Sequence, residues 1–157
     1  MSLASPESRL INGAGIHLGI VAARFNPTLV DGLLARVVAA LRSSGVKEKH
    51  LTVLRVPGSH EVPWAAQALA TQRGCDGVIG LGVLLAGETS HHELVGQSVS
   101  HALQRVALDT RVPVINGVIV VNSLAQARAR CLGKINWGAE FARAALEMAV
   151  LKRKASR

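Results

Sequence analysis

The chain has 157 residues, of which 49% are hydrophobic and 18% are charged; these proportions are typical of a compact domain and exclude an intrinsically disordered chain. Its longest apolar run, Val78 to Ala86, is far shorter than the roughly 18 residues of a membrane-spanning helix. The first 14 residues lack the basic start and apolar run of a secretory signal. We therefore expect one cytoplasmic domain over residues 1–157, with no membrane partner.

Eighteen lysines and arginines against ten acidic residues give a net charge of +8, which favours anionic partners, either small substrates or a nucleic acid. Two phenylalanines, two tryptophans and no tyrosine are too few for the aromatic platform that binds single-stranded nucleic acid. Nucleic acid is therefore the weaker alternative. Cys75 and Cys131 form no Cys-x-x-Cys motif, and we expect two reduced thiols.

Four short and nearly continuous apolar runs predict β-strands, at residues 17–23, 51–56, 77–83 and 113–121. Such runs are typical of strands covered on both faces, as in a parallel sheet between helices. Apolar residues at spacings of three and four predict intervening helices. The order β-α-β-α-β-α-β-α-α predicts a flavodoxin-like α/β fold, a three-layer sandwich with a central parallel four-stranded sheet and helices on both faces.

Local signals mark where some of these helices begin. Ser90 and Ser123 are followed three residues later by Glu93 and Gln126, which is the spacing of a capping box. Asn26, which precedes a proline, is a weaker start signal.

The two ends of the chain differ from the centre. Residues 1–16 have no helical period, and we expect an N-terminal arm or edge strand, added to a neighbouring subunit. The basic tail, residues 152–157, is expected to complement the negative pole of the last helix and to lie in solvent. The competing hypothesis for this tail is a nucleic-acid-binding role.

Ligands of open parallel sheets bind beyond the carboxyl ends of the strands, so the segments after each strand hold the candidate site residues. After the third strand, Gly87 allows close approach of the backbone to a ligand, while Glu88 and Thr89 lead into a helix whose first amides lack helical partners. This arrangement favours an anion, typically phosphate. The alternative is an ordinary strand-to-helix turn in which Glu93 is only a cap.

His91 lies four residues before Val95, so its imidazole is expected to face the carboxyl edge of the sheet, where it can transfer protons. His92 is expected to lie in solvent. Adjacent histidines point to diverging faces, unlike the His-Glu-x-x-His pair of a helical zinc site, and we expect no metal.

Four segments, each at the end of its own element, resemble the 6,7-dimethyl-8-ribityllumazine synthase family. They are residues 23–26 (Ala-Arg-Phe-Asn), 56–63 (Val-Pro-Gly-Ser-His-Glu-Val-Pro), 82–91 (Gly-Val-Leu-Leu-Ala-Gly-Glu-Thr-Ser-His) and 145–149 (Ala-Leu-Glu-Met-Ala). The likeness covers residues 17–151. It implies a transferase of riboflavin biosynthesis that condenses 5-amino-6-(D-ribitylamino)uracil with 3,4-dihydroxy-2-butanone 4-phosphate, releasing phosphate and water with no metal or redox cofactor.

The resemblance also implies residue roles. His91 transfers protons, Phe25 stacks on the pyrimidine, and Glu61 accepts hydrogen bonds from ribityl hydroxyls. The backbone amides near Gly87 and the guanidinium of Arg130 bind the phosphate. The other implied substrate-binding positions are Asn26, Ser59, His60, Val83, Leu84, Leu85, Glu88, Thr89, Asn116, Lys134 and Trp137. Simpler alternatives are that Phe25 anchors a loop, that Glu61 caps a helix, and that Arg130 is a solvated helix residue with Arg128 as its rival.

His60, Asn116, Ala129 and Trp137 differ from the residues that this family commonly has, so a family member with a changed substrate is an alternative. The resemblance implies clefts shared between the subunits of a homopentamer, with the Asn116 and Arg130 regions coming from the second subunit. Some members assemble twelve pentamers into an icosahedral 60-mer capsid, with which the short connection 131–136 is compatible. Riboflavin synthase is a further expected partner.

Overall fold

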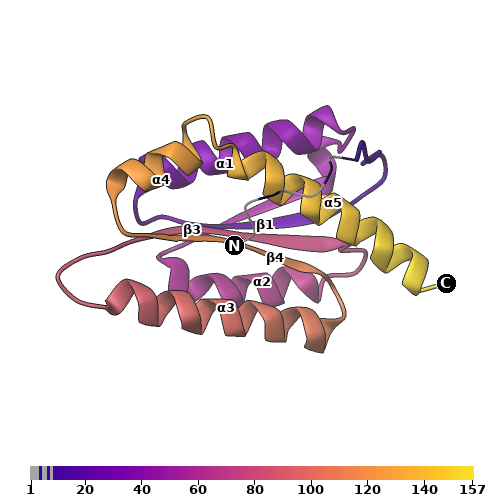
Figure 1. Ribbon diagram of the computed structural model, residues 1–157. Helices are drawn as coiled ribbons and strands as arrows, with labels where there is room; N and C mark the ends of the chain where they lie inside the picture. The colour runs from indigo at the N-terminus through magenta and orange to yellow at the C-terminus, as the bar shows by residue number, and fades with distance from the viewer. Residues whose placement is uncertain (1–3, 5–6, 8) are drawn as a thin grey trace.

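The computed structural model describes residues 4, 7 and 9–157, and Figure 1 shows a sheet between two layers of helices. The strands are β1 (Leu18–Ala23), β2 (Leu51–Val56), β3 (Gly77–Leu85) and β4 (Val114–Val121). All neighbours pair in parallel, in the order β2-β1-β3-β4. The predicted flavodoxin-like α/β sandwich with four parallel strands is confirmed, and its strand bounds agree with the sequence prediction to within two residues.

Within the described residues, five α-helices cover the two faces of the sheet (Figure 1). One layer holds α1 (Pro27–Ser43), α4 (Leu124–Cys131) and α5 (Trp137–Ala155), and the other holds α2 (Val62–Ala70) and α3 (His91–Thr110). Each layer buries its own apolar cluster against the sheet, with Leu33 and Leu146 in the first and Leu69 and Leu103 in the second. Two one-turn 3-10 helices, η1 (Glu48–His50) and η2 (Ser59–Glu61), were not predicted.

The prediction that every strand is covered on both faces is wrong for β2. Its four residues from Thr52 to Arg55 are exposed, because β2 is an edge strand that pairs only with β1 in this chain. Val53 and Leu54 are 42% and 36% exposed. An apolar edge with unpaired backbone groups is a surface to which another strand can add.

Of the three predicted helix starts, one has the expected side-chain contact. Ser123 Oγ accepts a hydrogen bond from the Gln126 amide at 3.2 Å. Ser90 precedes α3 but forms no side-chain cap, so Glu93 is not the partner in a capping box. Asn26 also forms no cap; instead its side-chain amide donates to the Val83 carbonyl at 2.9 Å.

Residues 9–13 form no strand, and the Gly13 amide donates to the Ser44 carbonyl at 2.7 Å. Most of the first eight residues of the predicted arm lie outside the described residues. No helix in the described part of the chain is long and apolar enough to cross a membrane.

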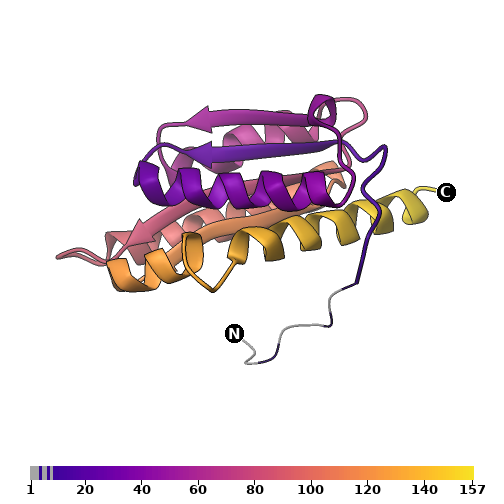
Figure 2. The ribbon, with the colours of Figure 1, turned by 90° about the horizontal axis from the view of Figure 1, so that it is seen from above.

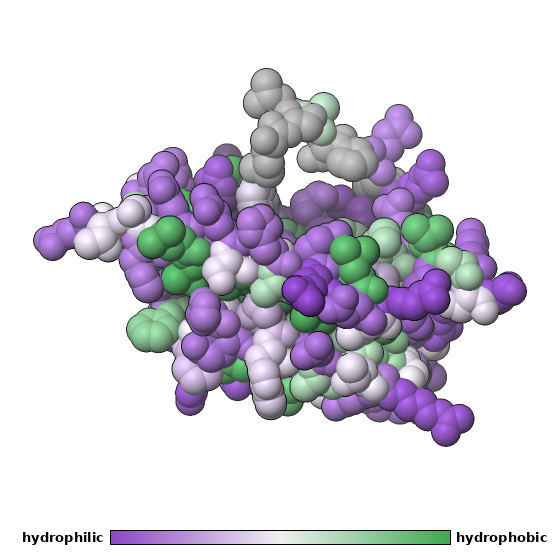
Figure 3. Space-filling model, turned by 90° about the horizontal axis from the view of Figure 1, so that it is seen from below, coloured by the Kyte–Doolittle hydropathy of each residue, from purple (hydrophilic) through white to green (hydrophobic). Residues whose placement is uncertain are grey.

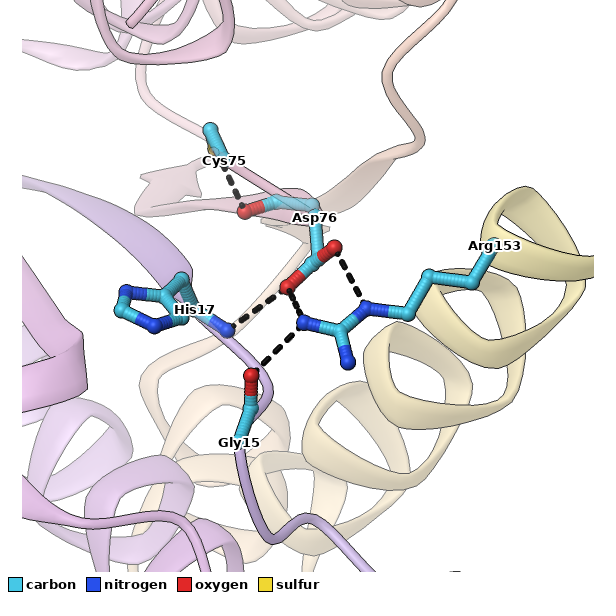
Figure 4. A network of polar contacts seen from close by, with 6 residues as sticks. Gly15, His17, Cys75, Asp76 and Arg153 are labelled. Carbon is cyan, nitrogen blue, oxygen red and sulfur yellow. Dashed lines mark hydrogen bonds and ion pairs between the residues drawn. The ribbon is translucent and has the colours of Figure 1, made fainter. Parts of the chain in front are cut away.

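Arg153 of the basic tail is exposed, as expected, but it also forms an ion pair with a buried carboxylate. Its guanidinium donates to both carboxylate oxygens of Asp76, at 2.9 and 2.7 Å, and to the Gly15 carbonyl at 2.6 Å. Asp76, only 4% exposed, also accepts from the His17 amide at 2.8 Å. Figure 4 shows how this network ties the end of α5 to the segments that precede β1 and β3.

Burial alone raises the pKa of Asp76, but hydrogen bonds from Arg153 and the His17 amide outweigh it and hold that pKa below the ordinary value of 3.8. A carboxyl with a lowered pKa stabilises the folded state above its unfolded pKa, and this contribution is lost as the pH falls through the folded pKa.

We therefore expect Asp76→Asn to lower the free energy of unfolding at pH 7 by about 2 kcal/mol, the usual scale for a hydrogen-bonded charged group. The difference from the unsubstituted protein should shrink as the pH falls below 3.8. Urea titrations across this range provide the test. Asp109→Asn, which removes an exposed ion pair with Arg105, is the control and should be near neutral; equal stability of both variants at pH 7 would contradict the prediction.

Candidate active site

A cleft of about 540 Å³ opens at the carboxyl ends of β1 and β3, the edge toward which the strand arrows point in Figure 2. Every predicted site residue from Phe25 to His91 except Glu88 lines it. The lining residues are Phe25, Asn26, Gly58, Ser59, His60, Glu61, Val83, Leu84, Leu85, Gly87, Thr89, His91, His92 and Val95. A larger hollow of about 810 Å³ lies between the ends of α3 and α5 and the start of β4, and none of the predicted site residues lines it.

Phe25 is held at the mouth of this cleft by its neighbours. The ring is 71% exposed and lies against Gly58, where an added Cβ would come within 3.2 Å of Phe25 Cδ2. Asn26 turns the chain with a left-handed backbone (φ 55°), a conformation that asparagine adopts more readily than most residues, and its bond to Val83 fixes this turn on β3. An exposed ring on a fixed turn is suited to stack on a flat ligand.

Glu61 has the capping role that was its simpler alternative. Its Oε2 accepts a hydrogen bond from the Gly58 amide at 2.8 Å and so closes η2. Oε1 has no hydrogen-bond partner among the described residues and is available to a hydroxyl donor. The cap therefore orients the carboxylate at the cleft without using all of its acceptor capacity.

The segment between β3 and α3 presents unpaired backbone donors. The Ala86 amide donates to the Val121 carbonyl at 2.9 Å, but the next three amides, of Gly87, Glu88 and Thr89, have no acceptor within the described ranges. No atom lies within 4 Å of an added Cβ at Gly87. Together with the start of α3, these donors form a site suited to an anion. The Glu88 side chain is exposed and does not line the cleft.

His91 lines the cleft as expected, although it is exposed. The expectation that His92 lies in solvent is wrong: the residue is 9% exposed and lines the same cleft. Its Nε2 lies 4.0 Å from Glu93 Oε1, and its buried Nδ1 has no hydrogen-bond partner in the part of the chain that the structure describes. The spacing of seven from His92 to the buried Val99 was the signal that places it on the inner face of α3.

The predicted residues Asn116, Arg130, Lys134 and Trp137 do not line this cleft. Arg130 and Trp137 form a second group in which the guanidinium carbon lies 5.4 Å from the centre of the indole ring. Asn116 is exposed on the edge strand β4, and its Oδ1 accepts from the Val118 amide at 3.0 Å. A single chain therefore does not bring all the predicted site residues into one cleft.

Among the described residues, no group of three histidine, cysteine or acidic side chains is arranged to hold a metal ion. The two cysteines are free, and burial raises the pKa of each thiol. The polar side chains that line the cleft carry imidazole, carboxylate, hydroxyl and amide groups.

The model of the 6,7-dimethyl-8-ribityllumazine synthase family matches residues 15–153. The chain belongs to this family. Relatives named 6,7-dimethyl-8-ribityllumazine synthase include that of Verminephrobacter eiseniae, 42% identical over 141 residues, which are 90% of each chain. That of Acidovorax ebreus is 44% identical over the same share of both chains, and that of Thermococcus gammatolerans is 44% identical over 142 residues, 90% of this chain and 91% of the relative. The residues matched by the lumazine synthase family model include every predicted site residue.

Proposed function

We propose that this chain condenses 5-amino-6-(D-ribitylamino)uracil with 3,4-dihydroxy-2-butanone 4-phosphate to give 6,7-dimethyl-8-ribityllumazine, phosphate and two molecules of water. This transferase reaction is the penultimate step of riboflavin biosynthesis. The observation that supports it best is one cleft that combines the exposed ring of Phe25, the imidazole of His91 and three unpaired amides from Gly87 to Thr89. Those groups match a flat heterocycle, a proton transfer and a leaving phosphate.

The condensation needs proton transfers at nearly every step. Each of the two amines that attack a carbonyl gives up a proton, and each of the two hydroxyls that leave as water takes one up. The C–H bond next to the phosphorylated carbon is broken as phosphate leaves. His91 lines the cleft and is the group suited to move these protons near neutral pH. The ring of Phe25 covers the pyrimidine, Glu61 Oε1 accepts from a ribityl hydroxyl, and no cofactor takes part.

Phosphate departure needs donors that are already in place. The unpaired amides of Gly87, Glu88 and Thr89 provide one side of such a site, and the fork of Arg130 provides bidentate hydrogen bonds from the other. Lys134 adds charge, while Asn116 and Trp137 complete the pocket around the pyrimidine. We assign this second group to a neighbouring subunit, because within one chain Arg130 does not line the cleft of His91.

The surface of the chain supports assembly into a homo-oligomer. Exposed apolar side chains occur on β2 and on the α2–α3 face, where Trp64, Leu94 and Leu108 are 77%, 65% and 69% exposed. Figure 3 shows this face as hydrophilic with separate hydrophobic patches. Large exposed apolar groups of this kind mark interaction surfaces. We propose a pentamer, or twelve pentamers joined as an icosahedral capsid, with riboflavin synthase as a further partner in the cytoplasm.

Light scattering of the purified protein is therefore expected to give about five or sixty times the 16.5 kDa mass of one chain. A monomer that forms lumazine would contradict the shared cleft, because it would hold Arg130 away from His91.

The direct test of the proposed reaction mixes the purified protein with both substrates and follows the absorbance and fluorescence of the product. Inorganic phosphate should appear in a one-to-one ratio with lumazine. Omission of either substrate is the control. Failure to form lumazine from these two substrates, by a protein that is folded and oligomeric, would point to the alternative of a family member with a changed substrate.

A further inference from the structure

Helix α4 is weakly anchored in its own layer. It has eight residues, and only Ala127 and Cys131 of them are buried. A short helix with so little buried apolar surface gains little stability from packing. Yet α4 carries Arg130, and the connection that follows it, residues 132–136, carries Lys134. The position of the proposed phosphate-binding side chains therefore depends on what else fixes the end of α4.

Two contacts with α1 hold this end. Leu132 packs against Gly32, where an added Cβ would overlap Leu132 Cδ2, and Arg36 forms hydrogen bonds with the same stretch of chain. Arg36 of α1 donates from one nitrogen to the Gly133 carbonyl at 2.6 Å and from the other to the Leu132 carbonyl at 2.5 Å. Figures 1 and 2 show α4 and its connection to α5 alongside α1. Carbonyls at the end of a helix lack helical partners, and a positive charge there is favourable. Arg36 thus clamps the point at which α4 ends.

Close packing leaves Arg36 little freedom. An added Cβ at Gly138, in the first turn of α5, would come within 2.6 Å of Arg36 Cβ and 3.0 Å of the Leu33 carbonyl. The stem of Arg36 therefore lies directly against the start of α5, while its guanidinium reaches the end of α4. One residue of α1 therefore contacts both the start of the connection, directly after α4, and the helix to which the connection leads.

The clamp is close to Arg130. Arg130 lies two residues before Leu132, and its guanidinium donates to the Gln126 carbonyl at 3.1 Å and lies over Trp137. Burial raises the pKa of Cys131, and the positive charges of Arg36 and Arg130 both act against this shift, as expected if both guanidiniums lie near the thiol. The clamp, the thiol and the proposed phosphate ligand form one cluster.

We propose that Arg36 is a positioning residue for the phosphorylated substrate, which acts by fixing the end of α4 and hence Arg130. This inference rests on the proposed role of Arg130. Arg36 touches neither substrate. Its loss is expected to leave α4 folded but mobile, so that the phosphate loses a donor that was already in place, while proton transfer at His91 is unaffected.

The test compares Arg36→Ala with Arg42→Ala, which removes another arginine of α1 that forms an exposed ion pair with Glu48. We expect Arg36→Ala to raise the KM for the phosphorylated ketone about tenfold, the effect of losing part of a charge-assisted hydrogen bond. kcat and the KM for the pyrimidine should change by less than about threefold, and Arg42→Ala should change nothing. Arg36→Lys keeps the charge but cannot form both hydrogen bonds in the same geometry. Its KM for the ketone should lie between those of the unsubstituted protein and Arg36→Ala.

Hydrogen exchange supplies a second measurement that a general loss of stability would not reproduce. Faster exchange confined to residues 124–136 in Arg36→Ala supports the clamp, whereas unchanged exchange there, or faster exchange across the sheet, overturns it. If Arg36→Ala does not fold, the same comparison is made with Arg36→Lys.

The double variant Arg36→Ala/Arg130→Ala separates this inference from the proposed function. If Arg36 acts through Arg130, the change at Arg36 should have no further effect on the KM for the ketone once Arg130 is absent. Additive effects would overturn the inference while leaving the role of Arg130 intact. If Arg130→Ala alone leaves that KM unchanged, the proposed role of Arg130 fails, and the inference fails with it.

Discussion

Replacement of His91 by alanine is expected to slow lumazine formation by roughly 10²-fold or more, the usual contribution of a positioned acid-base group. The loss should appear in kcat, because an imidazole that moves protons contributes more in the transition state than in the substrate complex. The KM values for both substrates should change little. Steady-state kinetics of product absorbance, with each substrate varied in turn, provides the measurement.

His101→Ala is the matched control for this experiment. His101 is an exposed histidine of the same helix and does not line the cleft, so its removal should leave kcat unchanged. Equal rates for His91→Ala and the unsubstituted protein would remove His91 from the mechanism. In that case His92, the more buried of the two other histidines that line the cleft, would be the next residue to replace.

Arg130→Ala is expected to raise the KM for the phosphorylated ketone by about 10- to 100-fold, because a bidentate guanidinium contact to phosphate contributes roughly 1.5–3 kcal/mol. The KM for the pyrimidine should change far less, since the proposed contact of Arg130 is with the phosphate. Inorganic phosphate should also inhibit the variant more weakly. Kinetics with each substrate in turn, and competition by phosphate, measure both effects.

Arg128→Ala is the control for this second variant, because Arg128 lies on the same helix and is exposed. It should behave like the unsubstituted protein. A large effect of Arg128→Ala with none of Arg130→Ala would reverse the assignment of the two arginines. If Arg130→Ala raised only the KM for the pyrimidine, Arg130 would bind the pyrimidine substrate and not the phosphate.

Local patterns in the sequence predicted the fold and the edge of the sheet at which the cleft lies. Parallel strands bring the segments after them to a common edge, so the grouping of Phe25, Glu61 and His91 follows once the four strands are recognised. Which strand lies at an edge depends on pairing order, and the sequence pattern does not contain that order. The exposure of β2 was therefore missed, because its apolar composition resembles that of the buried strands.

The histidine pair shows a second limit. The apolar spacing along a helix does not decide which of two adjacent residues in its first turn faces inward, and α3 begins at His91 itself. Counting back from Val95 placed His91 on the inner face, whereas counting back from Val99 places His92 there. The structure brings both into the cleft, with His92 the more buried of the two.

Sequence patterns of this kind do not predict contacts between distant parts of the chain. Arg36 and Gly133 are 97 residues apart, and Asp76 and Arg153 are 77 apart. Nothing near either arginine in the sequence distinguishes it from the other basic residues. Both contacts became visible only once the helices had been placed in their layer.

The most direct test of the proposed site is a crystal structure of the protein with an inhibitor that carries a ribityl chain. The inhibitor ring is expected to lie against Phe25 with His91 within hydrogen-bond reach, and Arg130 of an adjoining subunit is expected to face the amides from Gly87 to Thr89. An inhibitor bound in the hollow between the ends of α3 and α5, or at any place away from Phe25 and His91, would contradict this account.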